Sequence, residues 1–503
     1  MQNLAAIDVG SNAIRLLIGR LYDNGKTETL DSLRVPVRLG KDTFKNGIIS
    51  EGSMQELLAA FTTFKKVIHD NGVSQVRAVS TSAMREAANQ AIVCDRILHA
   101  TGIMVDVISG EEEARLIHLA VSKAIDLHNS IALLIDIGGG SMETTLSENG
   151  NILFTESYKV GAVRLLSQFS QQEKPGALIE DLVREYIEAS RRLIQRRLQG
   201  HDVTLLIGTG GNVEEIGELA HKLFGRRTNR VISMDDLEAL IARMSRLSYE
   251  ERIRQLGLRP DRADVIVPAA ILLKAIADET NQQEISIPRV SLKDGLLADL
   301  VEQIMHDANP ARREQVWVSI QRLGSKYEID EVHARHVAEL ACRIFEQTYP
   351  LHNLEPEYQQ LLEAAAYLHD IGHFIGTIDH EKHGYYILTA NPIIGLSDAQ
   401  QAIIANLVRS HRRQLPSSEE IPFHTFSQKE HLAVIKLLSI LRIADGLDTS
   451  RSGRVKDVCL KSKNGAWELE LIGEDNLLLE KWTTEKRKNL FCELFGVTLK
   501  IKD

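Results

Sequence analysis

The sequence predicts an α/β fold built from two similar halves, followed by an all-helical domain and a small α+β domain. A strand ending in an aspartate, a glycine-rich turn and a second strand occur at Asp8 and again at Asp136. Each second strand runs to an Asn-Gly pair, at Asn24 or Asn149, which is a strong signal for a β-hairpin. After Arg312 the apolar residues follow helical periodicity, and strand alternation returns near the end.

Both predicted hairpins carry small residues at the tip, directly after the aspartate. The tips are Gly10, Ser11 and Asn12 in the first copy and Gly138, Gly139, Gly140 and Ser141 in the second. Glycine tips allow backbone N–H groups to approach phosphate oxygens closely, and an aspartate beside them can hold Mg²⁺. The repeat therefore predicts a duplicated fold that grips one anionic ligand from both sides.

The pattern divides the chain into four expected domains. Residues 1–125 alternate strands with helices, and residues 126–305 form a second α/β domain that repeats the hairpin. Residues 306–451 are helical almost throughout, and residues 452–503 return to strand alternation around a short helix. We find no low-complexity segment and no long linker between these domains.

Composition limits the classes of function. The chain has 503 residues, 44% of them hydrophobic and 25% charged, as in an ordinary globular protein. It contains neither an apolar run of about 18 residues, as a membrane span requires, nor a signal-peptide pattern. The four cysteines are scattered, which is typical of reduced thiols in a cytoplasm. The net charge of −10 argues against general nucleic-acid binding, although a local basic groove is compatible with it.

An acidic run between the two hairpins is the first candidate for catalysis. Ser109 and Glu112 have the spacing of a capping box at a helix start, and Glu111 complements the helix dipole. Glu113 has neither explanation. Successive helical residues point about 100° apart, so one of the three glutamates is expected to face a given cleft. A carboxylate near a bound phosphate can deprotonate an attacking water.

Arg85 is a second candidate. It follows a strand and lies within the first turn of a helix. The planar fork of arginine suits phosphate oxygens, and a surface arginine fits the same spacing equally well.

Four segments in this order resemble the exopolyphosphatase/guanosine pentaphosphate phosphohydrolase family, which belongs to the actin-like, sugar kinase and heat-shock ATPase superfamily. They are residues 8–12 (DVGSN), 80–85 (STSAMR), 109–115 (SGEEEAR) and 136–141 (DIGGGS). The resemblance extends over essentially the whole chain. It implies two ribonuclease H-like domains with a cleft between them, where Mg²⁺ supports hydrolysis of a terminal phosphoanhydride.

The resemblance also implies roles for individual residues. Glu113 precedes the Ala-Arg pair and matches the catalytic glutamate. Asp136 and Glu143 match metal-associated carboxylates, and Asp8 is expected to act through Mg²⁺ or its water shell. The phosphate-binding positions are Gly10, Ser11, Asn12, Arg85, Gly138, Gly139, Gly140 and Ser141. Mg²⁺ is the expected cofactor, and a monovalent cation such as K⁺ is a further candidate.

The helical domain carries an ordered set of histidines and aspartates that resembles the HD phosphohydrolase superfamily. The implied metal ligands are His333, His369, Asp370 and Asp445, and His383 and His411 could extend the site to a second metal. Imidazole and carboxylate together suit a divalent metal. The alternatives are a bound metal, independent catalysis, or a relic that supports a dimer or lines a channel.

The leading hypothesis is a cytoplasmic, Mg²⁺-dependent exopolyphosphatase that acts as a homodimer and binds neither nucleic acid nor membrane. The closest alternative is removal of the 5′-phosphate of guanosine pentaphosphate (pppGpp), or both activities in one protein. There are three rival hypotheses: a kinase or ATPase, a binding protein without turnover, and an enzyme whose main site lies in the helical domain. Basic clusters at 191–197, 226–230 and 411–413 are candidate contacts for a long polyanion, with solvated helix faces as the alternative.

Overall fold

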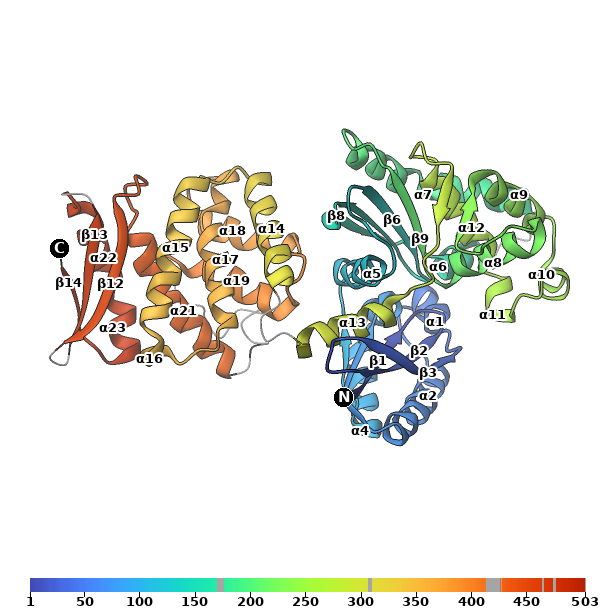
Figure 1. Cartoon of the computed structure of the whole chain (residues 1–503), viewed down its shortest axis with the longest axis horizontal. Helices are drawn as coiled ribbons and strands as arrows, with labels where there is room; N and C mark the ends of the chain where they lie inside the picture. Colours follow the sequence, from blue (N-terminus) through green and yellow to red (C-terminus); the bar gives the residue numbers. More distant parts are fainter. Residues whose placement is uncertain are drawn as a thin grey trace. The chain divides into compact units, whose positions relative to one another are not determined.

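The chain forms two compact units, Met1–Asn309 and Pro310–Asp503, which are described separately (Figure 1). The computed structural model describes residues 1–169, 176–305, 310–412, 426, 428–463, 466–473 and 476–502. Among these residues, no helix combines the length and the apolar character that a membrane crossing requires.

The first unit begins with a sheet of five strands in the order β3-β2-β1-β4-β5. Its strands are β1 (Gln2–Val9), β2 (Ile14–Leu21), β3 (Thr27–Val35), β4 (Val73–Ser80) and β5 (Val105–Val107). The first three form an antiparallel meander, and β4 and β5 continue the sheet in parallel. The first expected hairpin is therefore present, and Asp8 lies near the end of its first strand, β1.

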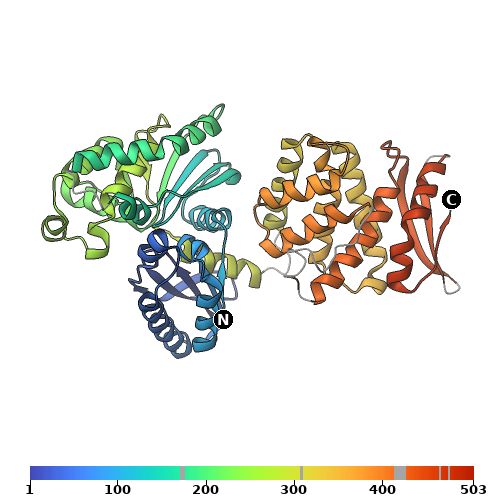
Figure 2. The same cartoon turned by 180° about the vertical axis from the view of Figure 1, so that it is seen from behind.

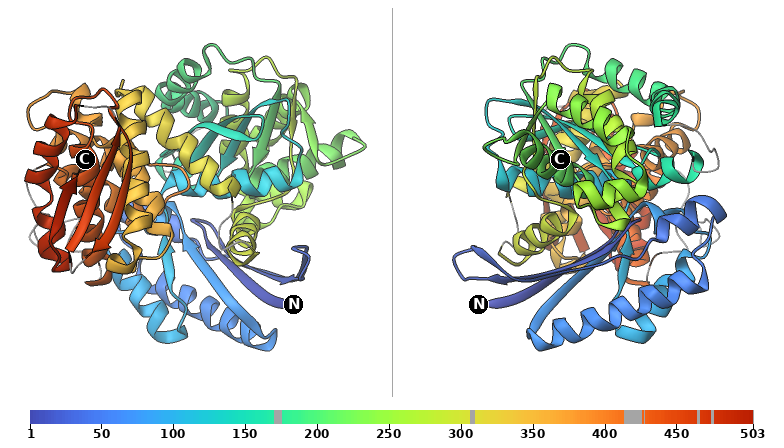
Figure 3. Two further views of the ribbon diagram at one scale, coloured as in Figure 1. Left: turned by 60° about the vertical axis from the view of Figure 1, so that its left-hand side comes forward. Right: turned by 90° about the vertical axis from the view of Figure 1, so that its right-hand side faces the viewer.

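Helices cover this sheet and supply its core. They are α1 (Leu39–Asn46), α2 (Glu51–Asp70), α3 (Ser82–Glu86), α4 (Gln90–Thr101) and α5 (Gly110–Ala124). In α2, Leu57, Phe61 and Phe64 recur at helical spacing and are fully buried. Figure 3 shows this long helix running along one face of the blue strands.

The second sheet of the same unit has the order β10-β11-β9-β6-β7-β8. Its strands are β6 (Ile131–Ile137), β7 (Met142–Glu148), β8 (Asn151–Tyr158), β9 (Leu205–Thr209), β10 (Val231–Ser233) and β11 (Glu284–Ser286). As in the first sheet, a meander (β6, β7, β8) is joined by a strand parallel to its first member. The turn at Asn149 and Gly150 has positive φ at both residues, as the expected Asn-Gly hairpin turn requires.

This part has eight helices among the described residues. They are α6 (Ala162–Phe169), α7 (Gly176–Leu198), α8 (Gly211–Phe224), α9 (Met234–Ser245), α10 (Tyr249–Leu256), α11 (Pro260–Ala263), α12 (Ile266–Ala277) and α13 (Leu292–Met305). The central one, α12, is buried apart from Lys274 and packs against α6, α7, α8, α9 and α11. Helix α13 returns to the first sheet and packs on α5, β1 and β2. The chain thus crosses twice between the two sheets.

The second unit is a helical bundle followed by a small sheet. The helices are α14 (Pro310–Lys326), α15 (Glu331–Gln347), α16 (Tyr349–His352), α17 (Glu357–Leu368), the 3₁₀ turn η1 (Ile371–Phe374), α18 (His380–Ala390), α19 (Asp398–Ser410) and α21 (Gln428–Gly446). The last part comprises β12 (Val455–Lys463), β13 (Ala466–Gly473), α22 (Leu478–Arg487), α23 (Asn489–Phe495) and β14 (Leu499–Lys502). One hydrophobic cluster joins both parts, and α22 packs on α21 (Figure 2).

Gly295 brings α13 into backbone contact with α5. A Cβ atom at this position would collide with the carbonyl oxygen of Leu116 on α5. Helix α5 carries Glu111, Glu112 and Glu113 in its first turn. The close contact between α5 and α13 therefore determines how far these glutamates lie from the first sheet.

Replacing Gly295 with alanine is expected to destabilise the protein by about 1–3 kcal/mol, the usual cost of overpacking a fitted interface. Gly52→Ala is the matched control, because it is an exposed helical glycine whose added Cβ would meet Ser50 Oγ at 3.9 Å. The control is expected to keep or slightly raise stability. Thermal unfolding followed by circular dichroism compares the two, and equal effects would contradict the tight contact.

Candidate functional site

The two glycine-rich tips lie against each other in the first unit. Each is closed by a backbone bond, from Gly10 N–H to Ala13 O (3.2 Å) and from Gly138 N–H to Ser141 O (3.0 Å). A Cβ atom on Gly139 would lie 2.9 Å from Ser11 Cβ, so a larger residue would separate the tips. The two glycine-rich tips, which the sequence predicts to bind one ligand together, are therefore in contact.

A cavity opens beside the tips and is lined by residues from both sheets. Its lining includes Asp8, Gly10, Ser11, Asn12, Arg15, Glu113, Asp136, Gly138, Gly139, Gly210, Gly211, Asn212 and Arg262. Residues 210–212, at the start of α8, thus form one wall. Gly140 packs against Phe44 and Ser82 instead, and the Ser141 side chain is buried.

Three carboxylates meet beside this cavity, and we call them the acidic triad: Glu113 from α5, Asp136 from β6 and Glu143 from β7. One oxygen of each lies within 4.8 Å of the others. Asp136 and Glu143 are cross-strand neighbours in the second hairpin. The three residues are only 6%, 7% and 1% exposed, so their charges face each other with little water between them.

Burial and mutual repulsion raise the pKa values of the triad. Burial raises the pKa of Glu113 well above its usual value, and the neighbouring Glu143 adds to this. Burial and the Asp136 charge raise the pKa of Glu143 to about 8. Burial likewise raises the pKa of Asp136 to about 6, against the effect of Thr209 Oγ1, which donates to it at 2.6 Å. A bound cation would relieve the repulsion.

The triad fits a hard divalent cation. Among the described residues, Glu113 Oε2 and Glu143 Oε2 are buried without a hydrogen-bond partner, while Ser157 Oγ donates to Glu143 Oε1 at 2.7 Å. Mg²⁺ prefers such oxygen ligands. Asp8 is paired with Arg15 at 2.9 Å, and burial raises its pKa in spite of that partner.

Arg85 belongs to the site. Its Nη1 donates to the Ile108 carbonyl at 2.5 Å and lies 3.8 Å from Glu113 Oε2. The structure therefore places the Arg85 side chain beside the acidic triad.

The start of α5 differs in one respect from the sequence prediction. Ser109 caps the helix by accepting from Glu112 N–H (3.2 Å), as expected. The predicted reciprocal bond of a capping box is wrong, because the Glu112 carboxylate binds Arg115 at 2.7 and 2.9 Å. Arg115 also donates to Asp299 on α13 at 2.8 Å, and Arg77 contacts both acids. This buried network holds Glu112 away from the cavity and leaves Glu113 facing it.

Two arginines of the cavity were not predicted. Arg15 is the cross-strand partner of Asp8, a register that the hairpin pattern could have revealed. Arg262 lies far away in sequence and donates to Asn212 at 2.7 Å. Burial and the charges of Arg15 and Arg34 lower the pKa of Arg262 to about 10, so an anion there would be strongly attracted.

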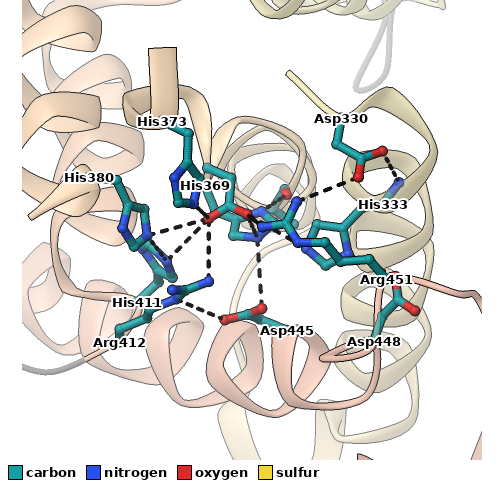
Figure 4. A network of polar contacts seen from close by, with 12 residues as sticks. Asp330, His333, His369, His373, His380, His411, Arg412, Asp445, Asp448 and Arg451 are labelled. Carbon is teal, nitrogen blue, oxygen red and sulfur yellow. Dashed lines mark hydrogen bonds and ion pairs between the residues drawn. The ribbon is translucent and has the colours of Figure 1, made fainter. Parts of the chain in front are cut away.

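The second unit brings most of its predicted metal ligands together (Figure 4). Two groups of three residues have ligand atoms within 4.8 Å of one another. The first group is His333, His369 and Asp445, and the second is Asp370, His373 and His380. With His411, these residues form what we call the His–Asp cluster. His383 belongs to neither group, and the sequence reasoning did not select His373.

Hydrogen bonds orient the imidazoles toward the centre of the His–Asp cluster. His333 Nδ1 lies 2.7 Å from Asp448 Oδ2, His369 Nδ1 lies 2.7 Å from Ala366 O, and His411 Nδ1 lies 2.6 Å from Val408 O. Each Nδ1 is thereby assigned as a donor, and each Nε2 is left to accept. Burial lowers the pKa of His411 to about 3 and keeps it neutral.

Asp370, a member of the second group, also approaches the first group. Its Oδ2 is 3.6 Å from His369 Nε2, and its Oδ1 is 3.4 Å from both His373 Nε2 and His380 Nε2. Burial opposes ionisation of Asp370, but the surrounding histidines and arginines hold its pKa well below the usual range. A carboxylate flanked by imidazole nitrogens fits the donor set of a divalent metal site.

The predicted basic clusters have local partners. Arg191 pairs with Glu188 and Glu279, and Arg226 pairs with Asp236. Arg412 faces the His–Asp cluster, while Arg413 lies outside the described residues.

Comparison with known proteins identifies the family. A model of the Ppx/GppA phosphatase family matches residues 21–304, which is more than half of the chain. The chain belongs to this family. A second model, Ppx/GppA phosphatase, domain III, matches residues 317–487. The family of exopolyphosphatases and guanosine pentaphosphate phosphohydrolases named from the sequence is thereby confirmed, and the chain is a phosphoanhydride hydrolase.

Named relatives and solved structures of this Ppx/GppA family differ in their activities. A guanosine-5′-triphosphate,3′-diphosphate pyrophosphatase of Aliivibrio fischeri is 26% identical over 92% of both chains. One of Photobacterium profundum is 28% identical over 87% of this chain and 85% of that protein.

The solved exopolyphosphatase of Cytophaga hutchinsonii ATCC 33406 is 27% identical, with a TM-score of 0.57 over 60% of this chain and 98% of that one. An Aquifex aeolicus Ppx/GppA family member, at 22% identity and a TM-score of 0.53 over 61% of this chain and 99% of that one, supports the fold alone. Both fit the predicted α/β fold of the actin-like type.

Replacing Glu143 with glutamine is expected to raise the thermal midpoint in EDTA, more at pH 8 than at pH 5. An unfolded glutamate loses its proton near pH 4.5, whereas the folded carboxyl keeps it to about pH 8. The wild type therefore loses stability as pH rises through this window, and the amide does not. Glu111→Gln, in the partly exposed acidic run of α5, is the control. Equal gains at both pH values would contradict the assignment.

Proposed function

We propose that the first unit is a Mg²⁺-dependent exopolyphosphatase that removes the terminal phosphate of inorganic polyphosphate. The observation that carries this proposal is the buried acidic triad beside two glycine-rich tips and Arg85. The alternative substrate is pppGpp, through hydrolysis of its 5′-phosphate, and one protein could hydrolyse both. The exopolyphosphatase of C. hutchinsonii supports the first substrate, and the named relatives from A. fischeri and P. profundum support the second.

In this proposal the terminal phosphate lies beside the tips, where backbone N–H groups and Arg85 contact its oxygens. Mg²⁺ held by Asp136 and Glu143, with Asp8 nearby, would supply further positive charge at the phosphate. Glu113 accepts a proton from the attacking water, and its raised pKa suits a base that works near neutral pH. The shortened chain then leaves. Most of the remaining rate acceleration comes from positioned charge.

Arg15 and Arg262 extend the positive lining beyond the triad. They approach each other at Gly211, where an added Cβ atom would lie 3.1 Å from Arg15 Nη2 and would collide with Arg262. This position suits phosphates behind the reacting one. A chain of phosphates and a nucleoside triphosphate both present them, so these arginines are compatible with either substrate.

We propose the finer organisation on the same grounds. The repeated meander-plus-parallel-strand arrangement supports two ribonuclease H-like domains, 1–125 and 126–305. The ordered histidines and aspartates support an HD-like domain, 306–451, followed by the α+β domain 452–503. A homodimer, a cytoplasmic location and K⁺ as a second cofactor rest on the family resemblance.

Glu113→Gln is expected to lower phosphate release by about 10²–10⁴-fold, because general-base catalysis contributes that much. Release is measured with Mg²⁺ on long-chain polyphosphate, pppGpp and ATP in parallel. The control is Glu111→Gln, which removes a carboxylate from the same helical turn and should retain activity.

The comparison of substrates also tests the rivals. Full turnover of ATP by Glu113→Gln would favour a kinase or ATPase, and tight polyphosphate binding without release by the wild type would favour a binding protein. Polyphosphate hydrolysis that survives Glu113→Gln would move the chemistry to another site.

We propose, as a second function, that the His–Asp cluster binds divalent metal. Buried Nε2 atoms of His380 and His411 lie 3.3 Å apart, and the pKa of each imidazole is lowered, so a shared metal explains their approach better than two facing lone pairs. Mn²⁺, Fe²⁺ and Zn²⁺ suit mixed imidazole and carboxylate ligands.

The metal content of the full-length protein tests this second proposal. In an Asp136→Asn/Glu143→Gln background, which removes ligands of the first site, Mn²⁺ is expected to remain bound after dialysis. Adding His369→Ala is expected to release it, because His369 Nε2 is buried and faces the centre. Adding His383→Ala is the control and should retain the metal. Equal metal content in the two triple variants would contradict the geometry.

A further inference from the structure

The buried Arg164 joins the second glycine-rich tip to helices on the first sheet. It lies near the start of α6 and is only 8% exposed. Its Nε donates to the Gly140 carbonyl at 2.7 Å, and its Nη2 donates to Glu86 Oε1 on α3 at 2.6 Å. The guanidinium also lies over the ring of Phe44 on α1, 4.1 Å from the centroid. The mechanism proposed above does not involve this residue.

The three glycine carbonyls of the second tip all accept hydrogen bonds from α6. Backbone N–H groups in the first turn of α6 donate to Gly138 O at 3.1 Å and to Gly139 O at 2.8 and 3.1 Å. The third carbonyl, that of Gly140, accepts from the Arg164 side chain. The orientation of the peptide that follows Gly140 therefore depends on a side chain, whereas backbone donors hold the first two.

The direction of these carbonyls fixes the direction of the N–H groups in the same peptides. In a planar trans peptide, the C=O and the N–H point in opposite directions. Because the three carbonyls turn toward α6, the N–H groups of Gly139, Gly140 and Ser141 turn away from it. The proposed function assigns N–H groups of this tip to the phosphate, and Arg164 sets the direction of the last one.

The tip has little room in which to adjust. An added Cβ atom on Gly161, directly before α6, would lie 2.5 Å from Gly139 O, and one on Gly140 would collide with the Phe44 ring. Gly140 is itself buried. Its carbonyl would become a buried acceptor without a donor if Arg164 were shortened, so the peptide is expected to turn.

Glu86 anchors the other end of the arginine fork. It directly follows Arg85 on α3, a helix of five residues. Arg85 in turn lies 3.8 Å from Glu113 Oε2 of the acidic triad. The fork of Arg164 thus connects the second tip with the helix that carries Arg85.

We propose that Arg164 is a positioning residue for phosphate hydrolysis, which sets the orientation of the second tip relative to Arg85. It acts through the Gly140 carbonyl, with Glu86 as its anchor, and not on the substrate itself. The inference rests on the proposed function, because that function places the terminal phosphate at the tips.

The test measures kcat and KM for Mg²⁺-dependent phosphate release by the full-length protein, on long-chain polyphosphate and on pppGpp. The variants are Arg164→Lys and Arg164→Met. A lysine keeps the charge and the long stem, but it lacks the fixed fork that reaches a carbonyl and a carboxylate together. Glu86→Gln leaves the Gly140 bond in place and keeps an acceptor for Nη2. Arg96→Met is the matched control, because it removes a two-bond pair with Glu51 that joins α4 to α2.

Both Arg164 variants are expected to lower kcat by about 10–100-fold, because a small misplacement at a reacting centre costs that much. Their KM is expected to change by less than about threefold, since the lost interaction acts mainly in the transition state. Glu86→Gln is expected to lower kcat by a few-fold at most, and Arg96→Met to leave it unchanged. Circular dichroism verifies that each variant is folded at the assay temperature, and Arg164→Lys decides if Arg164→Met is not.

Glu113→Gln, measured alongside, distinguishes the possible failures. Wild-type kcat in the Arg164 variants, with Glu113→Gln inactive, would overturn the positioning role and leave the proposed function intact. An equal loss in Glu86→Gln would also overturn it, because the ion pair between α3 and α6 would then account for the effect. Activity that survives Glu113→Gln would refute the proposed function, and the positioning role with it.

Discussion

The first unit depends on holding several negative charges together in a place that water hardly reaches. Glu113, Asp136 and Glu143 repel one another, and burial makes each charge costly. The surrounding structure offsets that cost with Arg85 and with hydroxyl donors to Asp136 and Glu143. A cation would relieve the repulsion among these carboxylates, and a phosphate, which they alone would repel, becomes favourable once the cation is bound.

Rigid support makes such crowding possible. The Arg115–Asp299 bond ties α5 to α13, and Gly295 allows the two helices to touch along their backbones. The second unit follows the same logic with softer ligands, because backbone carbonyls and Asp448 fix the imidazoles from behind. In both places the outer contacts decide which atoms face inward. The oxygen-only site suits Mg²⁺, and the imidazole-rich site suits transition metals.

Sequence patterns predicted the features that depend on residues close together in the chain. Both hairpins, the tips and the helix start at Ser109 follow from glycine, strand alternation and capping chemistry within a few residues. Arg115, the main partner of Glu112, lies only three residues along the helix, but the capping-box pattern competes for the same carboxylate. Arg77 and Asp299, which complete this network, come from distant segments that no local pattern reveals. Arg262 was missed for the same reason. A single arginine carries no spacing signal, and its role appears only once the fold brings it to the site.

Arg487 gives the His–Asp cluster an order of assembly. The histidines and aspartates of the cluster precede Arg487 in the chain, from His333 to Asp445. Arg487 donates to Asp445 from α22, which is synthesised after the bundle helices. Since synthesis runs from the N-terminus and domains fold as they emerge, the acidic triad of the first unit can form while the second unit is still being translated. The His–Asp cluster gains the Arg487 partner of Asp445 only when α22 packs on α21.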